Sequence, residues 1–88
     1  MLKRPTPNEV LIALSETRWP RTVFIAMKFY HMTPRPKSAL VLRRLRDLER
    51  AGYIVTDGYP NGYYGFEWSI TASGHAFLSV LLQERAAA

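Results

Sequence analysis

The sequence contains no cysteine, and this absence excludes two classes of small protein. A disulfide scaffold needs paired cysteines, and cysteine-based zinc sites need their thiolates. The two histidines, His31 and His75, have no carboxylate at ligand spacing, so we expect neither a metal site nor a cofactor. A chain without disulfides is compatible with a reducing compartment, and we expect it in the cytoplasm.

Long apolar runs are missing too. The longest apolar runs, of which residues 23–27 are one, contain five residues. A helix needs about 18 apolar residues to span a bilayer. At the N-terminus Lys3 and Arg4 are followed by Pro5 and Pro7 and by no long apolar core, which argues against a secretory signal. We therefore expect no association with a membrane.

The residue patterns of an active site are also absent from the sequence. No serine has a histidine and an acidic residue placed for nucleophilic catalysis. Gly58, Gly62 and Gly65 belong to a predicted β-hairpin and not to a phosphate-binding loop. We expect that the protein is not an enzyme.

What the sequence does contain is a clustered positive charge. Twelve lysines and arginines stand against seven acidic residues, which gives a net charge of +5 over 88 residues. Six of the twelve lie between positions 35 and 50. The length and the hydrophobic content of 48% indicate one folded domain, residues 1–88. Its charge favours an acidic partner, nucleic acid before membrane.

The basic cluster falls largely on one predicted helix, residues 39–51. Spacing of about 100° per residue places Val41, Leu45 and Leu48 on an apolar face. Arg43, Arg46 and Arg50 fall on the opposite half and are expected to be exposed. Gly52 then ends the helix, because glycine adopts the left-handed cap without penalty. On the charges alone, a solvated surface helix without a function explains the pattern equally well.

The other elements are predicted from caps, prolines and turn residues. Thr6 and Glu9 form a capping box, with Pro7 at the first helical position, that starts a first helix ending near residue 16; the alternative cap is Asn8. A second and largely apolar helix covers residues 21–32 and is expected to be central, and prolines end it. Strands at 53–56 and 63–70 flank a Gly/Pro/Asn turn and form a hairpin. Thr71 caps a last helix, residues 72–85. The predicted class is α+β, mostly α.

Two segments resemble known regulators. Residues 45–54, LRDLERAGYI, resemble the end of the recognition helix in bacterial winged-helix regulators. Residues 68–78, WSITASGHAFL, resemble the second wing strand and the following helix start in the MarR-like and PadR-like groups. The resemblance covers roughly residues 21–82. It implies a winged helix-turn-helix with a three-helix core, a two-stranded β-hairpin wing and a C-terminal helix. It also implies a transcriptional regulator that binds specific sequences of double-stranded DNA.

The same resemblance implies which residues contact DNA. The residues expected to approach the bases are Lys37, Ser38, Ala39, Leu40 and Arg43, and those expected toward phosphates are Arg35, Arg44 and Arg46. Arg43 is the best candidate for reading a base, because a guanidinium binds guanine O6 and N7 together. Leu40 is expected either to touch a thymine methyl group or to pack under the second helix or a partner protein.

The predicted wing departs from the family pattern, because residues 53–70 contain no lysine or arginine. Its tip instead carries Tyr59, Asn61, Tyr63 and Tyr64. Hydroxyl and amide groups contact phosphate, but a tyrosine-rich, uncharged tip also suits a protein interface. The alternative function is therefore a protein–protein interaction module that uses the wing.

The last helix carries more apolar residues than one small core requires. Phe77 and Leu81 are expected in the core, which leaves Leu78 and Leu82 on an adjoining face. A domain of 88 residues has little surplus surface to cover that face. We expect a homodimer through this helix, helped by the first helix; the alternative is burial of all four within one chain.

Overall fold

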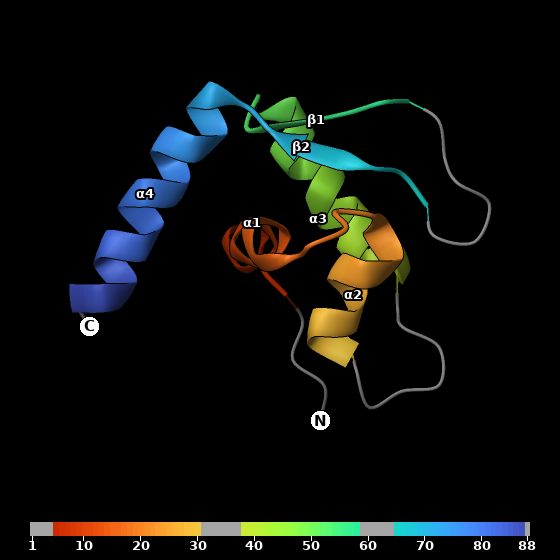
Figure 1. Ribbon diagram of the computed structural model, residues 1–88, viewed down its shortest axis with the longest axis horizontal. Helices are drawn as coiled ribbons and strands as arrows, with labels where there is room; N and C mark the ends of the chain where they lie inside the picture. The colour runs from red at the N-terminus through yellow and green to blue at the C-terminus, as the bar shows by residue number, and fades with distance from the viewer. Residues whose placement is uncertain (1–4, 31–37, 59–64, 88) are drawn as a thin grey trace.

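A computed structural model describes residues 5–30, 38–58 and 65–87. The elements follow in the order α1 (Pro7–Glu16), α2 (Thr22–Tyr30), α3 (Ser38–Arg50), β1 (Ile54–Thr56), β2 (Trp68–Ile70) and α4 (Ala72–Ala87) (Figure 1). The fold is α+β and mostly helical, with one two-stranded antiparallel sheet among the described residues. This agrees with the class that the sequence predicts.

Helix α1 begins as predicted. The Thr6 hydroxyl accepts a hydrogen bond from the Glu9 amide at 3.2 Å, and the Glu9 carboxylate accepts one from the Thr6 amide at 3.1 Å. Its apolar face, with Val10, Leu11 and Leu14, is buried. The two hydrogen bonds pair amides that a helix N-terminus otherwise leaves without partners.

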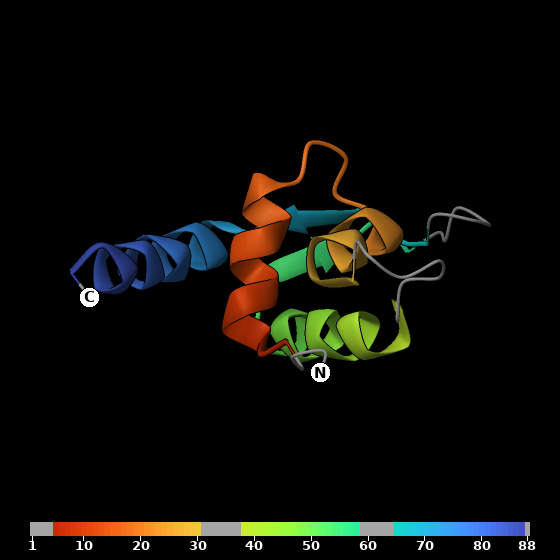
Figure 2. The same cartoon turned by 90° about the horizontal axis from the view of Figure 1, so that it is seen from below.

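Helix α1, and not α2 as the sequence predicts, is the central helix. It packs against α2, α3 and α4, and Figure 2 shows it between α4 on one side and α2 with α3 on the other. In α2 only one face is buried, through Ile25 and Ala26, while Met27 is 44% exposed. An apolar composition therefore does not make α2 central, because part of its apolar surface faces solvent. The predicted end of this helix and the turn after it lie outside the described residues.

Helix α3 has the predicted division into two faces. Val41, Leu45 and Leu48 are buried in the core, each 3% exposed or less. The helix ends where Gly52 takes a φ of +86°, a conformation that only glycine adopts readily. Sequence periodicity was sufficient here because one strong apolar stripe determines which side of the helix faces inward.

The hairpin is shorter than predicted and pairs with a third segment. Strand β1 pairs with β2 in the register Ile54↔Ile70, Val55↔Ser69 and Thr56↔Trp68. Residues 66–68, at the beginning of the second strand, form backbone hydrogen bonds with residues 20–22 at the start of α2. The Trp68 amide donates to the Pro20 carbonyl at 2.8 Å and the Thr22 amide to the Phe66 carbonyl at 3.1 Å. An antiparallel bridge between Arg21 and Glu67 joins the two segments.

Trp68 is the largest fully buried side chain at this junction. Its indole nitrogen donates a hydrogen bond of 3.0 Å to the hydroxyl of Thr22. Thr22 itself is only 4% exposed, so each polar group provides the other with a partner away from water.

Helix α4 starts from a tight joint with the end of α3. Thr71 caps it by accepting a hydrogen bond from the Gly74 amide at 3.0 Å, as predicted, and donates one to the Gly52 carbonyl at 2.7 Å. Gly74 lies so close to Tyr53 that an added Cβ would collide with the Tyr53 carbonyl oxygen. The rings of Tyr53 and Phe77 stack with centroids 4.6 Å apart.

The structure corrects the expected outer face of α4. Leu78 is 7% exposed and lies in the core, whereas Leu82 is 43% exposed. Position 78 falls one turn beyond Gly74, and the close approach of Gly74 to the body turns this side of the helix inward. Leu81 is buried as expected and Phe77 is half-buried. Leu78 is therefore not available for a dimer interface.

We predict that Leu45→Ala lowers the free energy of unfolding by about 2–5 kcal/mol, because it leaves a cavity in a fully buried site. Arg43→Ala on the same helix is the matched control and should change it by less than about 0.5 kcal/mol, because Arg43 is exposed. Chemical denaturation of both variants measures the difference. Similar midpoints for the two would contradict the assignment of the α3 faces.

Candidate nucleic-acid interface

The outer face of α3 is the candidate interface, and its four arginines differ sharply in their surroundings. Arg43 and Arg50 are exposed, while Arg44 and Arg46 are half-buried. Together with Asp47 and Glu49, residues 43–50 carry four positive and two negative charges, a balance of +2. The contacts of each arginine determine which of them are available to a ligand.

Arg43 is the available arginine. It points away from the apolar stripe of α3, and it has no hydrogen-bond or ion-pair partner within the part of the chain that the structure describes. A guanidinium without an internal partner keeps all five N–H donors for water or a ligand. The residue that the resemblance singles out for base reading is thus exposed and has no partner among the described residues.

Arg44 is held within the molecule. Its Nε donates to the Pro5 carbonyl at 3.2 Å, and its terminal nitrogen lies 3.4 Å from a carboxylate oxygen of Asp47. The side chain is 28% exposed. Arg44 therefore ties the segment before α1 to α3, and fewer of its donors remain for a phosphate.

Arg46 was expected to be exposed, but it is half-buried and packs on the base of the hairpin. Its guanidinium lies 4.6 Å from the ring centroid of Phe66 and 5.4 Å from that of Trp68. It also pairs with Glu49 at 2.9 Å. Stacking on two aromatic rings combines cation–π attraction with burial of the apolar stem. The first role of Arg46 is to fix the hairpin against α3.

Arg50 is the most exposed of the four, with 78% of its side chain accessible. It shares Asp47 with Arg44, at 3.4 Å. Exposed pairs of this kind contribute little to stability, so Arg50 remains available to an acidic partner near the end of the helix.

The remaining predicted contact residues divide into three groups. Leu40 is half-buried and Ala39 is exposed at the start of α3. Ser38 is the first residue of the helix, but its side chain is not described. Outside the described residues lie Arg35, Lys37, Tyr59, Asn61, Tyr63 and Tyr64. Among the described residues of the hairpin, Asp57 and Glu67 are the charged ones, and Glu67 lies 3.7 Å from Arg21.

Two contacts at the hairpin base were not predicted from the sequence. Arg46 stacks on Phe66 and Trp68, and Arg21 donates to the Gly65 carbonyl at 3.2 Å. A signal existed for the first, because Phe66 and Trp68 are two positions apart and therefore share one face of an extended strand. Nothing in the sequence indicates which arginine covers that face.

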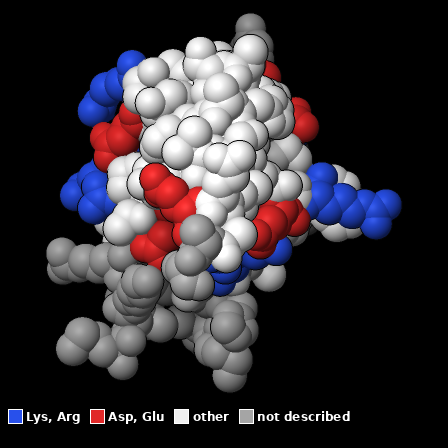
Figure 3. Space-filling model, turned by 90° about the vertical axis from the view of Figure 1, so that its left-hand side faces the viewer, with Lys and Arg blue, Asp and Glu red and all other residues white. Residues whose placement is uncertain are grey.

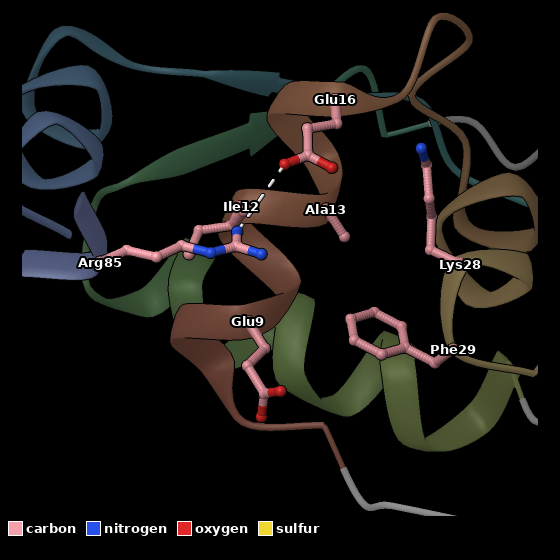
Figure 4. A pocket seen from close by; sticks show the side chains of 7 residues that line it. All are labelled: Glu9, Ile12, Ala13, Glu16, Lys28, Phe29 and Arg85. Atoms are coloured by element: carbon pink, nitrogen blue, oxygen red, sulfur yellow. Dashed lines mark ion pairs between the residues drawn. The ribbon is translucent and has the colours of Figure 1, made fainter. Parts of the chain in front are cut away.

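A hollow of about 480 Å³ lies between α1, α2 and the end of α4 (Figure 4). Its lining residues are Glu9, Ile12, Ala13, Glu16, Lys28, Phe29 and Arg85. Arg85 and Glu16 approach within 4.0 Å across it, but both side chains are more than half exposed. Such a pair adds little stability, and it connects the far end of α4 to α1.

No family model, no curated protein and no solved structure matches this chain. In the described ranges, no helix is long and apolar enough to cross a membrane. The same ranges hold no group of three or more histidine, cysteine, aspartate or glutamate side chains placed to bind a metal ion. The geometry of α3 and the hairpin therefore carries the functional argument.

We predict that Arg46→Ala lowers the free energy of unfolding by about 1 kcal/mol, through loss of the aromatic stacking and of the pair with Glu49. The control is Arg50→Ala, which removes the same charge from the same helix but no aromatic contact. Arg46→Lys should fall between, because an ammonium keeps the pair and lacks the flat stacking surface. Thermal melting resolves the series; identical melting temperatures for the two alanine variants would refute the stacking role.

Proposed function

We propose that the protein is a winged helix-turn-helix regulator, resembling the MarR-like and PadR-like groups, that binds specific sequences of double-stranded DNA. Three helices followed by an antiparallel hairpin and a further helix support the proposed fold. The isolated bridge between Arg21 and Glu67 attaches the start of α2 to the hairpin, which suits a wing that must be held against the helices. In this proposal α3 is the recognition helix and the protein acts in the cytoplasm.

The observation that carries the proposal is the exposure of Arg43, which contacts no polar partner in residues 5–30, 38–58 and 65–87. It lies in the first half of α3, the half that enters the major groove in helix-turn-helix proteins. Figure 2 shows α3 at one edge of the molecule, so that a groove has access to its outer side. A major groove about 12 Å wide accommodates a helix. With Arg43 on the bases, Arg50 lies two turns further along the same helix for a phosphate.

The internal contacts of Arg44 and Arg46 change the roles that these two residues have in the proposed interface. Both were expected toward phosphates, but each already makes internal contacts. In the proposal they set the direction of α3 and of the wing, and they contribute positive potential at longer range. Specific contact then depends on Arg43 more strongly than on either neighbour.

The proposed regulator acts as a homodimer through α4. One domain covers one half-site, and doubling the interface raises affinity and specificity. The outer side of α4 exposes Ala76 and Val80, which lie one turn apart on the same face. Figure 3 looks onto this side of the molecule, where uncharged residues occupy the broad centre and charged side chains lie around it. Val80, 47% exposed, takes the place of the buried Leu78 in the proposed interface, while Leu82, expected there and 43% exposed, lies on the other flank of α4.

We predict that Arg43→Ala reduces affinity for its selected duplex about 5- to 150-fold, equivalent to about 1–3 kcal/mol, and relaxes preference at one base pair. Arg85→Ala is the charge-matched control on α4 and should leave affinity within about twofold. Selection from random duplexes followed by titration at two salt concentrations measures both effects. Wild-type affinity should fall steeply with salt.

The DNA proposal fails if Arg43→Ala and Arg85→Ala bind the selected duplex alike. It fails also if the wild-type protein selects no sequence and its binding is insensitive to salt. The second result would favour the alternative module that binds a protein through its tyrosine-rich wing, since tyrosine contacts depend little on salt.

We predict that the double substitution Ala76→Glu with Val80→Glu converts the dimer into a monomer, because these exposed positions lie one turn apart on the same side of α4 and four carboxylates would face one another across the two-fold axis. The control, Val55→Glu, places a carboxylate on the equally exposed strand β1. Sedimentation velocity at tens of micromolar distinguishes the species. A wild-type protein that sediments as a monomer with and without DNA would exclude the dimer.

A further inference from the structure

The side of the molecule opposite α3 carries an apolar surface that neither DNA binding nor the α4 dimer uses. Figure 2 shows the loop between α1 and α2 on this side. Trp19, in that loop, is 61% exposed, and Met27 on α2 is 44% exposed. They are joined by Phe24, and we call these three residues the Trp19 patch. A hollow of about 370 Å³ lies against it.

The Trp19 patch is organised before any partner arrives. The indole lies 6.0 Å from the Phe24 ring at a tilt of 47°. On the same ring, the Arg18 guanidinium lies 5.3 Å from the centroid. A large aromatic side chain that is already held in place loses little conformational entropy on binding. Tryptophan is also the residue type that most often dominates the energy of a protein interface.

The charges around the hollow define the partner's sign. Its rim contains Arg18 and Lys28, which form no ion pair with any described residue, and Glu16, whose carboxylate lies 4.0 Å from Arg85. Two unpaired cations beside an apolar floor attract carboxylates that flank apolar side chains. Methionine at the edge allows the floor to adapt to a side chain of variable shape.

We propose that the Trp19 patch docks an acidic and apolar segment of a different protein, in which leucine or aromatic residues enter the hollow and aspartate or glutamate residues pair with Arg18 and Lys28. A second copy of this chain is a poorer occupant. The outer side of α4 is largely uncharged (Figure 3), and Glu84 is the one carboxylate that this helix could offer the two cations; the basic face of α3 would repel them. Because α3 lies on the other side of the molecule, the partner binds while α3 faces its own ligand.

The experiment selects a displayed library of random 12-residue peptides on the wild-type protein, with counter-selection on Trp19→Ser. We expect the enriched peptides to combine leucine or aromatic residues with aspartate and glutamate. One synthetic peptide of this kind should shift Trp19 fluorescence to shorter wavelength, while the buried Trp68 acts as an unchanging background. Met27→Ser and the double variant Arg18→Gln with Lys28→Gln should each weaken its binding at least tenfold.

Two controls separate this surface from the proposed DNA interface. Val55→Ser removes an equally exposed apolar side chain elsewhere, and Arg43→Ala alters α3; both should bind the peptide as the wild type does. The proposal is overturned if no enriched peptide depends on Trp19, or if the enriched peptides are basic or uncharged. It is equally overturned if duplex DNA displaces the peptide, or if Trp19→Ser abolishes self-association. Melting curves identify any variant that does not fold, and Met27→Ser then decides the outcome.

Discussion

Burial of the Trp68 indole is the constraint on which the rest of the structure depends. A buried N–H needs an acceptor, and Thr22 provides one at the start of α2. That requirement brings the second hairpin strand against the beginning of α2, where the backbones of 66–68 and 20–22 exchange hydrogen bonds. Arg46 of α3 then lies over the rings of Phe66 and Trp68. One side chain thus holds a strand and two helices in a fixed relation.

This arrangement distributes the arginines of α3 between two tasks. Arg46 covers the aromatic pair and Arg44 holds the segment before α1, so both contribute to shape. Arg43, with no such contact, keeps its donors for a ligand. A cluster that looks uniform in the sequence therefore contains residues with different roles. In the proposed regulator, specificity is concentrated at one position while its neighbours keep the helix properly directed.

Local chemistry was enough to predict much of this fold. The capping box of Thr6 and Glu9, the stop at Gly52 and the cap at Thr71 each involve residues within a few positions of one another. The apolar stripe of α3 follows from periodicity alone. Such features depend on the backbone nearby, and the folded state retains them.

The features that the sequence did not predict involve partners far apart along the chain. The bond from Arg44 to the Pro5 carbonyl spans 39 positions and that from Trp68 to Thr22 spans 46. Leu78 and Leu82 differ little in the sequence, and only the packing of α4 on the body buries one and exposes the other. For the same reason the candidate interface could be placed on α3, but the availability of Arg43 over Arg44 and Arg46 could not be foreseen.

The close approach of Gly74 to the Tyr53 carbonyl fixes the direction of α4 relative to α3. Thr71 bonds to the residue that ends α3, and Tyr53 stacks on Phe77 one turn into α4, so the joint is fixed at three points. Little freedom remains for α4 to swing relative to α3. If two chains associate through α4, the distance between their α3 helices is set at this joint. A change there would alter the spacing of the half-sites that the pair bridges, with no substitution in α3 itself.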